Sequence, residues 1–409
     1  MMTKLNIDIL YLIFQEINED KNFLFSCLLV NKFWCKFIVP ILWGNPLKYI
    51  NSKREDKLNI IYNIIILHLS EESRNFLKSK NINNIPMEQQ KLSFNYVSFC
   101  KYIDIIVVIT RNFSQRRLLR EELLKLFISE CSNIISLETS SIEHSVLFSQ
   151  EFFYPIYDYP GANISLSNLC ELICTSDHYS LFCGLAKICR SIEKISMILT
   201  CDNNYLAELI NVQNKIRYIK LIDLSKKTYR YSSSQFKNIF HSLEKQAHSI
   251  LYLNLKCADS YFLFSKFVNL ETLILYQFYD SEDLETAVFS KLQILELTSE
   301  SLNTAINIIQ NTNGNLWKVK IDVYSYETSR EYIQAIYKSI EIIMYDKNFD
   351  ESLNLFFNDW KNRKTLYIYN KSRYYNYEEY NFGEVVLKRD NDFWHDDYER
   401  TVWKECEYD

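Results

Sequence analysis

The apolar residues at the start of the chain recur with the spacing of helices. Residues 8–17 carry four of them on one face, and Asp8 stands where a helix cap is expected. Residues 24–39 continue the pattern and predict two further short helices, the second capped by Asn31. Pro40 is expected to end that helix, because proline has no backbone N–H to donate. Three short helices form too small a core to be stable alone, so something else should cover part of their apolar surface.

A six-residue phrase with apolar residues at positions 1, 4 and 6 recurs in the second half of the chain. Its copies are 24, 34, 20, 22 and 24 residues apart, and four of these five steps fit the 20–29 residues of leucine-rich repeats. The alternation predicts a half-buried strand in each copy, with helices between the copies. Stacked strand–helix units would share a continuous core and a curved sheet. The copies are IEKISM, IRYIKL, ILYLNL, LETLIL, LQILEL and LWKVKI, which begin at residues 192, 216, 250, 270, 292 and 316.

The remaining regions extend this organisation with weaker signals. IISLET, at residues 134–139, resembles the phrase without its last apolar position, so the stack is expected to begin near residue 126. An ordinary α/β domain with coincidental phrases is the alternative, because such short phrases are permissive. We therefore predict an α/β chain with four regions. They are a three-helix module at 1–46, a helical linker region at 47–125, a strand–helix solenoid at 126–345, and a C-terminal cap and acidic tail at 346–409.

Two charged regions were weighed as nucleic-acid sites. The basic run from Arg116 to Arg120 is followed at once by Glu121 and Glu122, which favours a solvated helix face with paired charges. The segment 356–380 interleaves aromatic and basic residues, as single-strand binders do, but the tail that follows is acidic. The whole chain carries a formal charge of −5. We expect no nucleic acid as a partner.

Composition excludes several further classes of protein. No apolar segment is long and uninterrupted enough to span a membrane, so we expect an intracellular protein in the cytoplasm or the nucleus, with no membrane partner. The 409 residues include only 5 glycines, and no glycine-rich phosphate loop is present. The motifs of serine hydrolases, zinc proteases and kinases are also missing. We therefore expect neither an enzyme nor a bound cofactor.

The 11 cysteines have no spacing typical of a disulfide framework, which indicates reduced thiols. Cys170, Cys174 and His178 recur every four residues, as metal ligands on one helical face could. They also lie in an apolar pattern that reads as a helix, from Leu166 to Cys174, in which buried thiols pack as small apolar groups. Structural zinc sites usually pair two closely spaced cysteines. We therefore favour a core role and expect no metal.

The first three predicted helices resemble a known family. LNIDILYLIFQEI, SCLLVNKFWC and VPILW follow, with their spacing, the F-box in its expanded fungal form. The resemblance covers about a tenth of the chain, and Asn6 stands where the family has proline. The repeated phrase in turn resembles degenerate leucine-rich repeats, although the asparagine or cysteine that usually follows each strand is largely missing.

The F-box resemblance implies a function and a set of contact residues. F-boxes dock the Skp-type adaptor of a cullin–RING ubiquitin ligase, so the resemblance implies that adaptor and the ligase core as partners. An aromatic anchor among aliphatic side chains is also typical of interface centres, which agrees with a docking role for Trp34, whereas Trp43 is expected to be internal. The adaptor contacts carried over from the family are Leu5, Leu10, Ile13, Phe14, Val30, Lys32 and Trp34.

The repeats are expected to bind a protein target through the outward-facing positions of their strands. The mixed charge and scattered apolar groups there suit a protein better than a phosphate or a sugar. The candidate target contacts are Lys220, Asn254, Lys256, Ile274, Tyr276, Glu296 and Lys320.

Two functions are therefore open at this point. One is a substrate-recognition subunit of an SCF-type ubiquitin ligase, which contributes proximity while catalysis takes place elsewhere in the complex. The other is a non-catalytic repeat scaffold that acts outside ubiquitination. The departure from the F-box pattern at Asn6 keeps this alternative open.

Overall fold

The computed structural model divides into two compact units. The first contains residues 1–216 with 223–229 and 236–243, and the second contains 217–222, 230–235 and 244–409. The structure describes residues 7–16, 20–48, 55–82, 85, 92–104, 113–139, 156–223, 236–256, 262–278, 282–299, 304, 307–309, 311–312, 315–316, 318–323, 341–344, 366–370, 381–382 and 385–387.

The chain opens with the three predicted helices, α1 (Ile7–Glu16), α2 (Lys21–Leu28) and α3 (Lys32–Gly44). Two details of the prediction are wrong. Helix α1 already includes Asp8, so this residue lies in the first turn rather than at the cap. Helix α3 continues through Pro40 to Gly44. Proline removes only one backbone donor, and the packing of Ile38 and Leu42 in the module core holds the helix on both sides of it.

The region expected to be a helical linker contains α4 (Glu55–Leu67), α5 (Glu71–Ser79) and α6 (Phe113–Glu130). It also contains η1 (Val97–Phe99) and strand β1 (Tyr102–Asp104), and β1 pairs with the next strand of the sheet. The sheet therefore begins about 25 residues earlier than the expected start near residue 126. The prediction that α6 turns a solvated charged face outward is wrong for Glu121 and Glu122, which are 3% and 5% exposed.

Every copy of the repeated phrase forms a strand. In all six copies the strand begins at the third position of the phrase, and the weak copy at residue 134 behaves in the same way. The strands are β2 (Ser136–Glu138), β4 (Lys194–Leu199), β5 (Tyr218–Asp223), β6 (Tyr252–Lys256), β7 (Thr272–Phe278), β8 (Ile294–Ser299) and β9 (Lys318–Val323).

One strand falls where the sequence pattern predicted a helix. The apolar run from Leu166 to Cys174 ends in β3 (Glu171–Thr175), and the helix before it, α7 (Ala162–Ser165), is a single turn. Strand β3 pairs in parallel with β2 on one side and β4 on the other. Pairing on both edges decides the conformation here, because a short apolar run fits a helix and a buried strand equally well.

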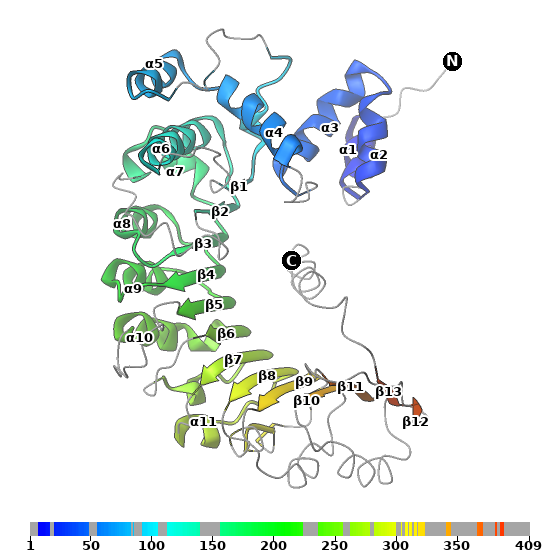
Figure 1. The fold of residues 1–409 in the computed structure, drawn as a ribbon, viewed down its shortest axis with the longest axis vertical. Coiled ribbons are helices and arrows are strands. Elements are labelled where there is room, and N and C mark those ends of the chain that lie inside the picture. The colour runs from blue at the N-terminus through cyan, green and yellow to red at the C-terminus, as the bar shows by residue number, and fades with distance from the viewer. Residues whose placement is uncertain are drawn as a thin grey trace. The chain divides into compact units, whose positions relative to one another are not determined.

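The strands stand in the sheet in chain order from β1 to β9. Neighbours run parallel from β1 to β4 in the first unit and from β5 to β9 in the second. In the first unit, helices α6 to α9 line one side of the strands (Figure 1). The remaining helical elements are η3 (Ile156–Asp158), α8 (Tyr179–Ile188), α9 (Asn204–Asn211), α10 (Lys237–Gln246), η4 (Ala247–Ser249), η5 (Phe264–Lys266) and α11 (Glu282–Thr286).

Successive repeats are joined by the same pair of backbone hydrogen bonds just before each strand. The N–H groups of Leu251 and Tyr252 both donate to the carbonyl of Arg217, at 2.9 and 3.0 Å. The next repeat repeats this geometry, because Glu271 and Thr272 donate to Leu251 at 2.8 and 3.0 Å. In the first unit the shared acceptors are the carbonyls of Lys101, Ile135 and Cys170. This regular joint gives the units a solenoid-like stacking.

Four further strands follow in the second unit. They are β10 (Glu341–Met344), β11 (Leu366–Asn370), β12 (Asn381–Phe382) and β13 (Val385–Leu387), in the sheet order β10-β11-β13-β12. The expected acidic tail, from residue 390 on, lies outside the described residues.

The predicted fold class is confirmed at the level of an α/β protein whose parallel strands alternate with helices in a solenoid-like arrangement. None of the described helices is long and apolar enough to cross a membrane.

Candidate docking surfaces

The three N-terminal helices share a small core. Helix α2 begins at Asp20, whose carboxylate accepts from the N–H of Phe23 at 3.0 Å, and α3 begins at Asn31. The side-chain oxygen of Asn31 accepts from the N–H of Trp34 at 2.9 Å, which confirms the predicted cap. The buried core consists of Leu10, Phe14, Leu24, Cys27, Ile38 and Leu42. We call residues 7–44 the N-terminal module.

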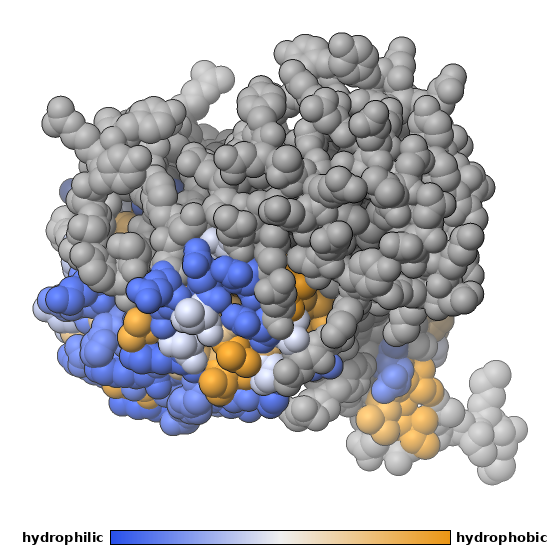
Figure 2. Space-filling model, turned by 90° about the horizontal axis from the view of Figure 1, so that it is seen from below, coloured by the Kyte–Doolittle hydropathy of each residue, from blue (hydrophilic) through white to orange (hydrophobic). Residues whose placement is uncertain are grey.

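This module exposes more large apolar side chains than its own core can cover. Of the fifteen exposed large hydrophobic residues in the described part of the chain, eight lie in the module, with exposed fractions of 38–88%. Elsewhere such residues are scattered. On the face that Figure 2 shows, the larger described area, at the left, is mainly hydrophilic with small hydrophobic groups, and a smaller described area at the lower right is mainly hydrophobic. The eight are Ile9, Leu12, Ile13, Phe23, Phe25, Leu29, Val30 and Phe33. Concentrated exposed apolar residues of this kind mark an interaction surface.

The structure divides the expected adaptor contacts into three groups. Ile13, Val30 and Lys32 are exposed and can touch a partner. Trp34 is half-buried, with its ring packed edge-on against Phe14 at 5.2 Å between centroids. Leu5 lies outside the described residues.

Leu10 and Phe14 belong to the third group, which is buried. They are 6% and 1% exposed and fill the module core, so they support the surface from beneath and supply no contact area. The helical period identified their face correctly but could not tell whether that face meets a partner or the other two helices.

Sequence reasoning missed six residues of the exposed set, namely Ile9, Leu12, Phe23, Phe25, Leu29 and Phe33. Their signal was available, because two of them flank the core-facing stripe of α2, at Phe23 and Phe25, where a soluble helix usually carries polar groups. Phe33 also packs edge-on against Phe37, at 5.2 Å.

The second candidate surface is the row of outward-facing side chains on β5 to β9. The strand registers place Lys220 beside Asn254, Asn254 beside Ile274, and Ile274 beside Glu296. Glu296 in turn lies beside Lys320, whose side chain is outside the described residues. The predicted column is therefore confirmed as a column.

The exposure expected along this row is only partly present. Lys256 is exposed, and Lys220, Tyr276 and Glu296 are half-buried. Asn254 and Ile274 are buried, at 8% and 4% exposed, which corrects their assignment as target contacts. Their short side chains stand between in-register neighbours on both sides, so longer side chains in the row offer the accessible surface.

The electrostatics of this row are partly compensated. The Lys318 ammonium lies 3.1 Å from the Glu296 carboxylate, and the Lys256 ammonium lies 6.0 Å from the centre of the Tyr276 ring. Burial, helped by the negative charge of Glu296, raises the pKa of Tyr276 to about 12, so the phenol keeps its proton at neutral pH. Lys256 is the exposed cation of the row among the described residues.

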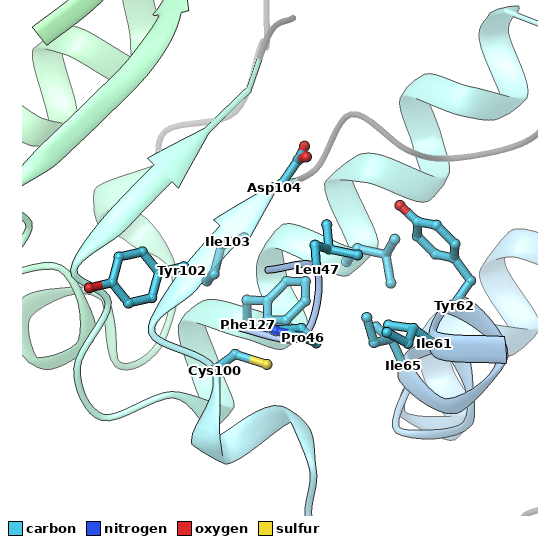
Figure 3. A pocket seen from close by; sticks show the side chains of 11 residues that line it. Pro46, Leu47, Ile61, Tyr62, Ile65, Cys100, Tyr102, Ile103, Asp104 and Phe127 are labelled. Carbon is cyan, nitrogen blue, oxygen red and sulfur yellow. The ribbon is translucent and has the colours of Figure 1, made fainter. Parts of the chain in front are cut away.

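The first unit contains a small pocket between α4, α6 and β1 (Figure 3). It is lined mainly by apolar side chains, with the Tyr62 hydroxyl and the Asp104 carboxylate at its polar side. Its cavity volume is ≈ 20 Å³, enough for one water molecule. Sites for small organic ligands enclose about 300–1,000 Å³. This cavity is therefore too small for such a ligand.

Of the cysteine–histidine cluster, Cys174 and His178 are buried in the core, whereas Cys170 is half-buried. Cys174 is fully buried with its sulfur 3.4 Å from that of Met197, and Nε2 of His178 lies 3.1 Å from the Thr175 hydroxyl. Burial lowers the pKa of His178 to about 4, so the ring is neutral at pH 7. The described part of the chain contains no group of three or more side chains placed to hold a metal.

Comparison with known proteins adds no relative. No protein-family model matches the sequence, and no curated protein matches it. The described helices and strands form an α/β solenoid-like stack, and a three-helix module with exposed apolar side chains precedes it in the sequence.

Proposed function

We propose that this chain is the substrate-recognition subunit of a cullin–RING ubiquitin ligase of the SCF type. The N-terminal module docks a Skp-type adaptor, and the strand row from β5 to β9 holds a target protein. Catalysis belongs to the other subunits, so this chain acts by bringing the target close to them.

The observation that carries the proposal is the exposed apolar surface of the module. Eight large hydrophobic side chains within residues 9–33 remain accessible although the three helices already have a closed core. The surface lies in the segment that resembles the F-box, and Trp34 stands half-buried at its base. Each Å² of apolar area that a partner covers contributes about 25 cal/mol of stabilisation, so a partner would make its main contacts on this surface.

The sheet row supports the second half of the proposal. Tyr276 supplies an aromatic ring of the kind enriched in protein interfaces, and Lys220, Lys256 and Glu296 supply charged groups of the kind found at the polar rim. F-box and leucine-rich-repeat identity are part of this proposal and rest on the sequence resemblance.

Co-purification with a Skp-type adaptor tests the proposal. The variant Ile13→Ser/Val30→Ser/Phe33→Ser changes only exposed positions, so its unfolding temperature should match the wild type while adaptor capture falls at least tenfold. The matched control is Ile164→Ser/Val288→Ser, two positions that are 67% and 58% exposed outside the module, and it should bind as the wild type does. A wild-type chain that fails to bind adaptor at micromolar concentration would leave the scaffold function outside ubiquitination.

A further inference from the structure

His68 lies in the turn that follows α4, and both of its ring nitrogens are engaged with the backbone. Nδ1 lies 2.8 Å from the carbonyl oxygen of Ile64, and Nε2 accepts from the N–H of Tyr96 at 3.1 Å. A carbonyl can only accept and a backbone N–H can only donate. The geometry therefore requires a neutral imidazole with its proton on Nδ1.

Tyr96, whose backbone N–H is bound by His68, also contacts the N-terminal module through its side chain. The Tyr96 ring lies 4.7 Å from the ring of Trp43, near the end of α3, and 5.7 Å from that of Phe94. Trp43 is half-buried and packs against the module core. One residue further along α3, the Gly44 carbonyl accepts from the N–H of Lys101 at 2.8 Å. Tyr96 therefore stands between His68 and the base of the module.

We propose that His68 is a proton-sensitive latch: its protonation releases the Tyr96 backbone and loosens the hold on the N-terminal module. A protonated ring has N–H groups at both nitrogens, so Nε2–H would point at the Tyr96 N–H and the hydrogen bond would be lost. The latch is closed when the ring is neutral and opens as the pH falls. Its link to adaptor docking rests on the proposed function, whereas the latch itself does not.

The surroundings of the ring contain few groups that could oppose this effect. The edge of the Tyr96 ring faces the imidazole at 6.0 Å between centroids, and its phenol is the titratable group among the described contacts. Helix α5 begins three residues after His68 and carries Glu71, Glu72 and the buried Arg74, and the described part of the chain shows no ion pair between these side chains and the imidazole. No neighbouring carboxylate is therefore seen to hold a proton on Nε2.

Hydrogen exchange at the Tyr96 amide, measured on the full-length chain and corrected for the intrinsic rate, tests the latch. Protection should fall several-fold as the pH is lowered from 7.5, in step with protonation of the imidazole ring. In His68→Gln the pH dependence should vanish, because an amide oxygen accepts a hydrogen bond without titrating. The control His248→Gln changes an exposed histidine of the second unit and should keep the wild-type profile.

A second measurement uses the wild type alone, so the test does not depend on how a variant folds. With ¹⁵N-labelled histidine, the ring nitrogens of His68 should report the Nδ1-protonated neutral form at pH 7.5 and lose it over the range in which protection falls. Protection that does not change with pH, or an Nε2-protonated neutral ring, overturns the proposal. Neither readout needs the adaptor, so a chain that binds no adaptor can still show the latch.

Discussion

Glu138 shows how the sheet changes the chemistry of a single residue. It stands on β2 in register with Asp104 of β1, and Glu171 of β3 is the next carboxylate along the sheet. The Ser136 hydroxyl donates to Glu171 at 2.7 Å. Burial, with the negative charges of Asp104 and Glu171, raises the pKa of Glu138 to about 8. The folded chain therefore prefers Glu138 protonated.

A stability profile against pH follows from this shift. Because the folded pKa is raised from 4.5 to about 8, the contribution of Glu138 is fully present below pH 4.5 and is lost as the pH rises through 8. Glu138→Gln, which imitates the protonated form, should be more stable than the wild type above pH 8, by roughly 2–4 kcal/mol. Urea unfolding at pH 5 and pH 8.5 measures the difference. The exposed Glu208→Gln serves as the control, and an equal effect in both variants would contradict the assignment.

At the scale of single residues, the sequence could not predict which side chains are exposed. Helical spacing placed Leu10, Ile13 and Phe14 on adjacent positions of one helix, yet Ile13 is 38% exposed while the other two are buried. The difference depends on where α2 and α3 pack, which the pattern of one helix does not contain. The same holds for Asn254 and Ile274, whose column was predicted and whose burial was not.

At the scale of elements, Gln213 ties neighbouring repeats together after α9. Its Oε1 accepts from the N–H of Ile192 at 3.0 Å, and its Nε2 donates to the carbonyls of Cys189 and Leu209 at 3.2 and 2.9 Å. The side chain is only 4% exposed. It satisfies backbone groups that the turn before β4 would otherwise bury without partners.

Gln213→Met should therefore destabilise the chain although it preserves the approximate volume. The Ile192 N–H and the Cys189 carbonyl would stay buried without this partner, and unsatisfied buried groups cost about 1–3 kcal/mol each. We expect a loss of roughly 2–4 kcal/mol in the free energy of unfolding, measured in urea. Gln293→Met, at an exposed position just before β8, should change it by less than about 0.5 kcal/mol. A similar loss in both variants would show that the hydrogen bonds are not the cause.

The repeated phrase predicted its strands well because strand burial is local and periodic. In each copy the first apolar residue is buried before the strand, and in the five copies from residue 192 to residue 297 positions 4 and 6 are buried as well. The start of β1 and the nature of β3 were missed, because both depend on pairing with strands distant in the sequence. Helix α3 passes Pro40 for a related reason, since packing on both sides outweighs one missing donor.

At the scale of the whole molecule, stability is distributed along the stack. Each strand contacts its two neighbours through parallel ladders and the shared carbonyl before the strand. A repeat therefore depends on the adjacent repeats more than on distant ones. A destabilising substitution in one repeat of the second unit should also destabilise the adjacent repeats. The N-terminal module, which has its own core, should stay folded.

Leu273→Ala tests this locality. Leu273 is fully buried in β7, in register with Leu253 and Leu295, and removing it should cost about 2–5 kcal/mol locally. Hydrogen exchange followed by mass spectrometry should show lost protection in peptides from β6 to β8, while peptides from α1 to α3 keep theirs. The control Leu263→Ala, at a position 37% exposed in the same unit, should leave all of these peptides unchanged. Equal loss in the N-terminal module would mean that the chain unfolds as one cooperative body. Docking of a partner there could then stabilise the distant target row directly, whereas local unfolding would keep the two surfaces thermodynamically separate.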